Sequence, residues 1–205
     1  IINNLEYDHA DIFRDLAAIE NQFHHLVRCV PAPGAIIRGE SDAIDRVLAR
    51  GVWTPVHSIT QHSASTYRDV STEGCSWRSL SAQADQLEIR SPDGETARLS
   101  WQLVGDHNAW NATAAISAAL HIGVPLKKCV EALSDFTGIK RRLELLGKPG
   151  GVAVYDDFAH HPTAIETTLA ALRAAEPRGK LVAVVEPRSN TMRMGQHRDQ
   201  LAPSA

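Results

Sequence analysis

The chain contains 205 residues, of which 43% are hydrophobic, 22% are charged and 5% are aromatic. Such a composition supplies enough apolar side chains for one large domain or two small ones and argues against a disordered chain. Lys and Arg total 21 against 24 for Asp and Glu, so the formal net charge is -3. We therefore expect neither nucleic acid nor an anionic membrane as a partner, because both attract proteins with a surplus of positive charge.

The sequence carries no signature of export or membrane insertion. No segment reaches the roughly 18 to 20 consecutive apolar residues of a membrane span, and no basic segment precedes an apolar one at the N-terminus. The cysteines Cys29, Cys75 and Cys129 are odd in number and far apart, which fits neither a disulfide framework nor a thiolate zinc site. These features predict a cytoplasmic protein. Because the chain opens on Ile1 without a Met, we expect a piece of a longer protein.

The first fifty residues are predicted to form two helices around a short strand. Apolar residues recur at intervals of three and four over 12–26, which indicates an amphipathic helix capped by Asp8 or Asp11. A strand is expected at 35–37 and a second helix at 41–50, and two or three further strands should follow.

The middle of the chain carries the signal of a β-hairpin followed by two helices. Apolar and polar residues alternate at 87–89 and again at 97–103, around a Ser-Pro-Asp-Gly turn. Helices are then predicted at 108–121 and 127–136. A charged stretch with three glycines comes next, so we expect one domain over 1–140 and another over 141–205.

The second domain is predicted to begin as a strand, a helix and a strand. Short buried strands are expected at 152–155 and 181–185, with a helix at 163–175 between them. A unit of this kind forms a right-handed crossover in a parallel sheet. The fold class expected from the whole chain is therefore α/β.

Four polar clusters follow the ends of apolar elements, where α/β proteins place their chemistry. In the first, at 3–9, His9 stands beside carboxylates and can give a nitrogen to a divalent metal, although Mg²⁺ on its own prefers oxygen. The alternative interpretation makes Asp8 a helix cap and His9 a surface residue.

The second cluster spans 105–111. Gly105 permits a close backbone approach, while Asn108 and Asn111 share one helical face and offer both a donor and an acceptor, as reading a purine edge requires. Helix caps and turn contacts would explain these asparagines equally well.

The third cluster is Lys140-Arg141-Arg142, followed by Glu144. Guanidinium groups match phosphate oxygens in a bidentate manner, whereas the plainer interpretation is a solvated charged linker.

The fourth cluster places two carboxylates and two histidines, Asp156, Asp157, His160 and His161, within six residues. They suit metal ligands, a general acid and base, or carboxylates that bind a ribose. A metal-dependent hydrolase built on these four side chains is one alternative function. The structural alternative is that Asp157 or His161 caps the helix that Pro162 begins.

Five segments, in this order, together resemble the Mur ligase family: NNLEYDHADIF (3–13), GDHNAWNATAA (105–115), FTGIKRRLE (136–144), VYDDFAHHPTAI (154–165) and EPRSNTM (186–192). The resemblance implies the later part of a central ATPase domain followed by the first part of a Rossmann-like C-terminal domain. It also implies ATP and Mg²⁺ as cofactors and amide formation through an acyl phosphate. The last two segments favour the branch that joins UDP-N-acetylmuramate to a murein tripeptide, L-Ala-γ-D-Glu-meso-diaminopimelate, over the branch that adds L-alanine.

The resemblance also implies roles for individual residues. His9 would ligate Mg²⁺ at the catalytic centre, Arg142 would reach the phosphates and Asp157 would hold the ribose. The adenine would be read by His107, Asn108 and Asn111. The residues expected to face the acyl phosphate or the incoming peptide are His160, His161, Arg188, Ser189, Asn190 and Thr191.

Other parts of the family's machinery do not occur in this sequence. The segment Gly34–Ser41 has the spacing of a phosphate-binding loop, but Glu40 stands where its Lys must be. The acidic Mg²⁺ ligands and the UDP-binding domain are lacking as well. We therefore expect no ligation by this polypeptide alone, and a nucleotide-binding relic without catalytic activity is a further alternative.

Overall fold

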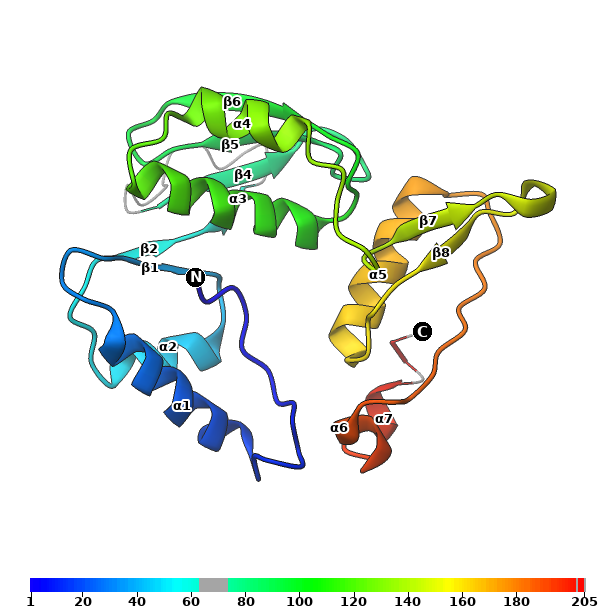
Figure 1. Ribbon diagram of the computed structural model, residues 1–205, viewed down its shortest axis with the longest axis horizontal. Helices are drawn as coiled ribbons and strands as arrows, with labels where there is room; N and C mark the ends of the chain where they lie inside the picture. The colour runs from blue at the N-terminus through cyan, green and yellow to red at the C-terminus, as the bar shows by residue number, and fades with distance from the viewer. Residues whose placement is uncertain (63–73, 202, 205) are drawn as a thin grey trace.

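The computed structural model describes residues 1–62, 74–201 and 203–204, and these residues form both helices and strands. The helices are α1 (Leu16–Cys29), α2 (Asp42–Ala49), α3 (Asp106–His121), α4 (Leu126–Ser134), α5 (Pro162–Ala175), α6 (Asn190–Arg193), α7 (Arg198–Leu201) and the 3-10 turn Pro149–Gly151. The strands are β1 (Ile36–Arg38), β2 (Val56–Ser58), β3 (Thr60–Gln61), β4 (Ser76–Ser79), β5 (Gln86–Arg90), β6 (Thr96–Ser100), β7 (Glu144–Gly147) and β8 (Val154–Asp156). We call the elements from α1 to α4, with the segment before them, the first lobe and those from β7 to α7 the second lobe (Figure 1).

One half of the first lobe is built on parallel strands. β1 pairs with β2, and Ile2 forms an isolated parallel bridge to Arg38. The helices α1 and α2 pack on each other, and their apolar faces enclose a core that contains Ile19 and Ile44. Glu20 is buried at this contact and accepts hydrogen bonds from Arg46 and Arg50, so its charge is compensated.

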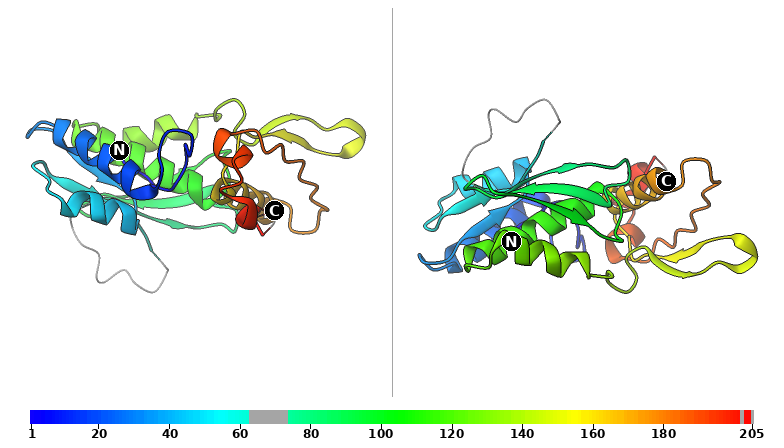
Figure 2. Two further views of the ribbon diagram at one scale, coloured as in Figure 1. Left: turned by 90° about the horizontal axis from the view of Figure 1, so that it is seen from below. Right: turned by 90° about the horizontal axis from the view of Figure 1, so that it is seen from above.

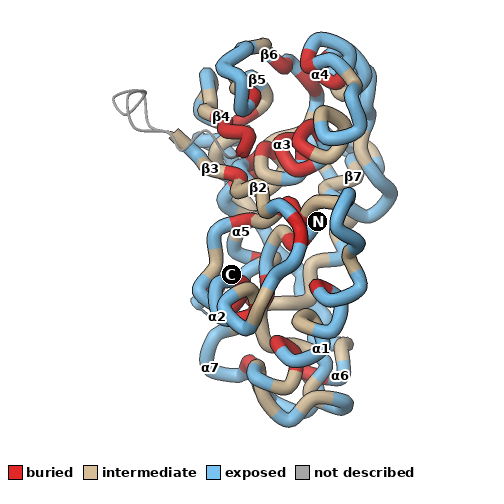
Figure 3. Tube along the Cα trace, turned by 90° about the vertical axis from the view of Figure 1, so that its left-hand side faces the viewer, coloured by how far each residue is buried: buried red, intermediate tan, exposed pale blue. Residues whose placement is uncertain are grey.

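The other half of the first lobe is a mixed sheet in the order β3-β4-β5-β6. Leu87 lies opposite Leu99 and Trp77 opposite Ile89 across antiparallel ladders, and all four side chains are buried. Helices α3 and α4 lie against this sheet, as Figure 2 shows. The buried residues gather on α3 and the strands beneath it (Figure 3), so the largest core of the described residues is here.

The second lobe buries less apolar surface. β7 and β8 form an antiparallel ribbon, and α5 contacts α3 across the boundary between the lobes. Ile165 and Ala171 are buried, whereas Leu146 and Val152 on the ribbon are largely exposed. The contact with α3 therefore fixes α5, and the ribbon projects away from it (Figure 1).

Several predicted elements are confirmed. The hairpin at β5 and β6, the helices α2 to α5 and the short strand β1 lie within a few residues of their predicted positions. The predicted cap of the first helix was wrong. α1 begins at Leu16, and Asp15 caps it by accepting the Ala18 N–H. The chain before it turns back on His9, so Ile12 stays outside the helix and is exposed.

The predicted parallel unit at the start of the second domain was also wrong. β8 hydrogen-bonds to β7 in an antiparallel ribbon, because the turn at Pro149–Gly151 folds the chain straight back. Residues 181–185 form no strand, and Val182 and Val184 are exposed rather than buried. Among the described residues no strand pairs with them, so their backbone groups lack the ladder that a strand needs.

None of the helices in the described part of the chain is long and apolar enough to cross a bilayer.

The cysteines should differ sharply in reactivity. Burial raises the pKa of the Cys75 thiol to about 11, although the Ser117 hydrogen bond opposes the shift. Burial also raises the pKa of Cys129, while Cys29 is exposed. We expect a thiol reagent at pH 8 to label Cys29 at least about a hundredfold faster than Cys75, because the thiolate is the reactive form. Peptide mapping by mass spectrometry measures this, with the protein in denaturant as the control. Equal rates in the folded chain would contradict the buried position of Cys75.

Candidate functional site

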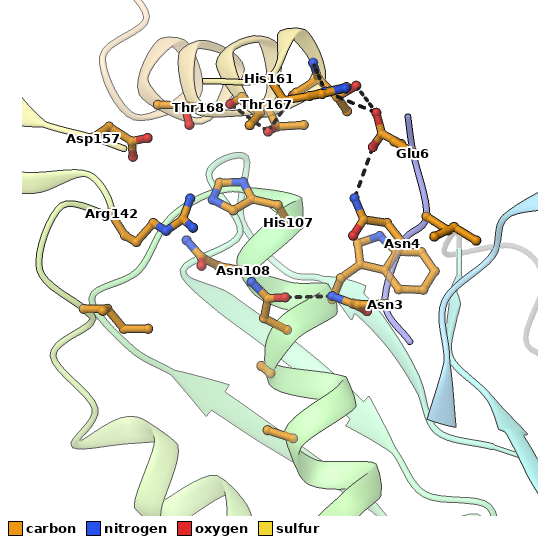
Figure 4. A pocket seen from close by; sticks show the side chains of 18 of the residues that line it. Asn3, Asn4, Glu6, His107, Asn108, Arg142, Asp157, His161, Thr167 and Thr168 are labelled. Carbon is orange, nitrogen blue, oxygen red and sulfur yellow. Dashed lines mark hydrogen bonds and ion pairs between the residues drawn. The ribbon is translucent and has the colours of Figure 1, made fainter. Parts of the chain in front are cut away.

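A cavity of about 1320 Å³ lies between the two lobes. Its walls come from the N-terminal segment, from α3, from the linker between α4 and β7, and from α5. Figure 4 shows polar side chains from these segments pointing toward one another across the opening. Segments far apart in the sequence thus supply one concave site, as in many ligand-binding clefts.

Gly105 allows α5 to approach the N-terminus of α3. Its φ of 91° lies in the left-handed region, and a Cβ at this position would be 2.6 Å from the Cβ of Ala171 on α5. Only glycine fits both conditions. The close approach predicted for Gly105 is confirmed, and its partner is the second lobe.

The asparagines of α3 line the cavity. Asn108 donates one amide N–H to the Val104 carbonyl oxygen at 2.8 Å, which fixes the orientation of the side chain. Asn111 accepts a hydrogen bond from Asn3 Nδ2 at 2.7 Å. Each amide has more hydrogen-bonding groups than these contacts use, so donors and acceptors remain for a ligand.

His107 carries a polar atom without a partner. Its Nδ1 is buried and makes no hydrogen bond in the part of the chain that the structure describes. Burial lowers the pKa of His107, and Arg142 adds to the shift, whereas Asp157 and Asp106 oppose it. The imidazole is therefore neutral at neutral pH, and its Nδ1 packs against Gly105.

The linker presents Arg142 from a strained turn. Arg141 and Leu143, on either side of it, both have positive φ values, 60° and 47°. The carboxylate of Asp157 accepts the Leu143 N–H at 2.8 Å and the Ala159 N–H at 2.7 Å, so it ties the linker to the loop after β8. Strain of this kind persists only where the surroundings enforce it, and it is common at binding sites.

The N-terminal segment and α5 form the opposite wall. Glu6 accepts a hydrogen bond from the Thr163 hydroxyl at 2.5 Å and lies 3.4 Å from His161 Nδ1. His161 also contacts the Tyr7 carbonyl oxygen through Nε2, at 3.3 Å. Its side chain caps α5 by accepting the Thr163 N–H, as the structural alternative for this cluster predicted.

The structure brings most of the predicted residues together. The cavity is lined by His9, His107, Asn108, Asn111, Arg142, Asp157 and His161. The other predicted residues, which are not among its lining residues, are His160, Arg188, Ser189, Asn190 and Thr191. The Ser189 hydroxyl caps α6, Asn190 donates to Asp11, and Thr191 is buried against Asp8, so these three side chains contact protein.

Some lining residues were not predicted. Glu6 and Asn3 belong to the first cluster but received no role, and Thr163, Thr167 and Thr168 lie on α5. The spacing of four residues places Thr163 and Thr167 on one helical face, with Thr168 next to them, and that signal was available in the sequence. What the sequence lacked was the fact that this face meets α3.

The described residues do not supply a complete metal site. No group of three or more His, Cys, Asp or Glu side chains among them is arranged to hold an ion. His9 is exposed and could give one ligand only. The same finding counts against the metal-dependent hydrolase, because Asp156 pairs with Arg141 and Asp157 accepts two backbone N–H groups.

The cavity fits a nucleotide better than a metal. The imidazole of His107, the amide groups of Asn108 that the Val104 bond leaves unused and the guanidinium of Arg142 line the same cavity as the carboxylate of Asp157. Such a set provides donors and acceptors for a base, acceptors for ribose hydroxyls and a cation for phosphates.

Comparison with known proteins identifies the family of the chain. Residues 1–119 match the Mur ligase middle domain, and residues 141–205 match the Mur ligase glutamate ligase domain. The chain belongs to the Mur ligase family. It is 47% identical over its whole length to the UDP-N-acetylmuramate–L-alanyl-gamma-D-glutamyl-meso-2,6-diaminoheptandioate ligase of Escherichia coli, and it spans 43% of that protein. It is 32% identical over 91% of its length to the UDP-N-acetylmuramate–L-alanine ligase of Acidothermus cellulolyticus, spanning 39% of that protein.

Solved Mur ligase structures share the fold. The chain superposes on the murein peptide ligase of Psychrobacter arcticus with a TM-score of 0.67 and 44% identity, covering 94% of this chain and 39% of that one. MurF of Acinetobacter baumannii gives a TM-score of 0.69 at 19% identity, with 96% and 42% covered, which shows the fold alone. The α/β fold expected from the Mur ligase resemblance is confirmed.

His107 should make stability depend on pH. Its pKa is lowered in the folded state, so its contribution to stability is complete above the unfolded pKa near 6.5 and is lost as pH falls toward the folded pKa. We expect His107→Gln to reduce the loss of unfolding free energy between pH 7.5 and 5.5. The difference should stay below the single-proton limit of about 1.4 kcal/mol per pH unit, because the ring is only partly shielded from water. Urea unfolding at both pH values measures it, with the exposed His25→Gln as the control. Identical pH dependence in the His107→Gln variant would contradict the lowered pKa of His107.

Proposed function

We propose that this chain belongs to an ATP-dependent ligase that joins UDP-N-acetylmuramate to the murein tripeptide L-Ala-γ-D-Glu-meso-diaminopimelate. Residues 1–140 would form the later part of the ATP-binding domain and residues 141–205 the first part of the C-terminal domain. The convergence of Asn108, Arg142 and Asp157 on one cavity carries the proposal. The identity to the Escherichia coli ligase, 47%, supports the choice of reaction.

The nucleotide would lie across the boundary between the lobes. Asn108 and Asn111, with His107, would contact the adenine from α3, and Asp157 would accept hydrogen bonds from the ribose hydroxyls. Arg142 would meet the phosphates, because its exposed guanidinium lines the same cavity as Asp157, whereas the neighbouring Arg141 pairs with Asp156. When bound, ATP supplies the phosphoryl group that activates a substrate carboxylate. The residues named here position it and neutralise its charge, which are the main contributions in phosphoryl transfer.

The metal contribution of this chain would be small. His9 lines the cavity and would give a single ligand to Mg²⁺, while the remaining ligands would have to come from the nucleotide, from water or from outside the described residues. We therefore assign His9 a supporting role at the phosphates.

The peptide end of the site would involve the second lobe. Arg188 is exposed, and its guanidinium suits the carboxylates of the incoming tripeptide. His160 lies 3.8 Å from Asp8 through Nε2, and with His161 it would face the reacting carboxyl group. Ser189, Asn190 and Thr191 use their polar groups within the protein, so their influence on the peptide would act through the shape of this loop.

The choice of substrate rests on relative similarity. Two ligases named for the tripeptide reaction, from Escherichia coli and Haemophilus influenzae, are 47% and 42% identical to this chain over all of it, while ligases named for L-alanine stand at 30–32%. The L-alanine reaction is therefore the second candidate. Both would take place in the cytoplasm, with no need for nucleic acid or a membrane.

Ligation by the complete protein tests the proposal. The full open reading frame that contains this sequence is expressed, and phosphate release is followed with UDP-N-acetylmuramate, ATP and either the tripeptide or L-alanine. We expect activity with the tripeptide and none from the 205-residue chain alone, because the phosphate-binding loop is lacking in this sequence. Activity with L-alanine alone would favour the second candidate, and inactivity with both amines would support a relic.

Both the positive charge and the planar guanidinium of Arg142 should contribute to kcat. In the complete protein we expect Arg142→Ala to lower kcat by roughly a hundredfold, by analogy with the loss of other transition-state donors, and Arg142→Lys by roughly tenfold. The exposed cation Lys148 on the β7–β8 ribbon provides a matched control, and Lys148→Ala should leave kcat unchanged. Steady-state kinetics with ATP varied measures both. A kcat unaffected by Arg142→Ala would remove Arg142 from the phosphate site.

A further inference from the structure

The turn that carries His9 adopts an unfavourable backbone conformation. His9 has a φ of 55°, in the left-handed region that residues with a Cβ rarely enter. The turn is closed by the N–H groups of Ile12 and Phe13, which both donate to the His9 carbonyl oxygen, at 2.8 and 2.9 Å. A conformation of this kind needs support from its surroundings to persist.

Thr191 of the second lobe provides such support on both sides of His9. Its hydroxyl donates to Asp8 Oδ1 at 2.6 Å and accepts the Ala10 N–H at 3.1 Å. One oxygen atom thereby holds the residue before His9 and the residue after it. The same Asp8 oxygen also accepts the His9 N–H at 2.7 Å, so three bonds converge on the turn.

Burial of Thr191 and the charge of Asp8 strengthen the hydrogen bonds between them. Thr191 is 1% exposed, so water cannot replace its hydroxyl. Burial raises the pKa of Asp8, but the bonds from Thr191 and His9, with the charges of His9 and His160, outweigh it and leave the pKa lowered. The carboxylate is therefore charged at neutral pH and is a strong acceptor.

The two partners lie 183 residues apart and on different lobes. α6 lies beside the N-terminal segment in both Figure 1 and Figure 2. A neighbouring bond, from Asn190 Nδ2 to Asp11 at 2.8 Å, strengthens the same contact. The conformation of the His9 turn thus depends on whether the second lobe is docked.

We propose that Thr191 is a positioning residue whose hydroxyl fixes the Asp8–Ala10 turn and so directs His9 into the cavity when the lobes are docked. The catalytic consequence rests on the proposed function, since only a ligase would use His9 at its phosphates. The support that Thr191 gives to the Asp8–Ala10 turn does not depend on the proposed function. Thr191 would then couple the arrival of the C-terminal lobe to completion of the cavity wall.

Hydrogen exchange at individual amides of the 205-residue chain tests the proposal. Thr191→Val keeps the size of the side chain and removes the hydroxyl, and Thr191→Ser keeps the hydroxyl. We expect Thr191→Val to speed exchange at Ala10, Ile12 and Phe13 by at least about tenfold, the effect of losing one buried hydrogen bond. Thr191→Ser should keep the protection of the natural chain. The His9 ring resonances should shift in Thr191→Val and keep their natural positions in Thr191→Ser.

Asn190→Ala is the matched control, because it removes a bond between the lobes next to the hydroxyl without touching it. Ala10 exchange should stay within about twofold of the natural chain in this variant. Unchanged protection of Ala10, Ile12 and Phe13 in Thr191→Val, with α3 and α5 amides also unchanged, would overturn the proposal.

If Thr191→Val also speeds exchange at α5 amides, the substitution has destabilised the second lobe, and Asp8→Ala then tests the proposal. That variant leaves α6 intact and removes the acceptor, so exchange at Ile12 and Phe13 should still quicken, and unchanged protection there would reject the proposal. Binding of ADP to the natural chain is measured in parallel by calorimetry. Absence of binding would count against the nucleotide site, while the exchange pattern would still decide the role of Thr191.

Discussion

The close packing of α5 against the N-terminus of α3 is the contact on which the cavity depends. It exists because Gly105 has no Cβ and can adopt a positive φ, which lets Ala171 approach the backbone. Behind this contact, His107 and Asn108 extend from the first turn of α3 toward the second lobe. A side chain at position 105 would separate the helices and open the wall that the threonines of α5 provide.

Around this contact the chain uses backbone hydrogen bonds to hold strained segments. Asp157 fixes the linker that presents Arg142, and Thr191 with Asp8 fixes the turn that presents His9. In both places a side chain from the second lobe satisfies N–H groups of a segment that belongs to the linker or the first lobe. The cavity wall is therefore a joint product of the two lobes, because contacts between them add to the local bonds of these turns.

The sequence predicted the fold well where the signal was local. The hairpin at β5 and β6 follows from period-two alternation around a turn, and α3 and α5 follow from apolar spacing. It failed for residues 181–185, whose apolar composition resembles a buried strand but whose pairing depends on other strands. It also misplaced the cap of α1, because Asp8, Asp11 and Asp15 are equally good caps and only tertiary bonds decide which one is free.

By itself the sequence determined which residue types carry chemistry, because Asn, Arg, Asp and His have fixed donors, acceptors and charges wherever they stand. Its five ordered segments also pointed to the Mur ligase family, which the matches over 1–119 and 141–205 establish. Only the tertiary structure decided which of these residues share a cavity and which serve the protein. Contacts such as those of Glu6 with Thr163 and Asp8 with Thr191 join positions more than 150 residues apart. Packing of the lobes creates them, and no local pattern encodes that packing.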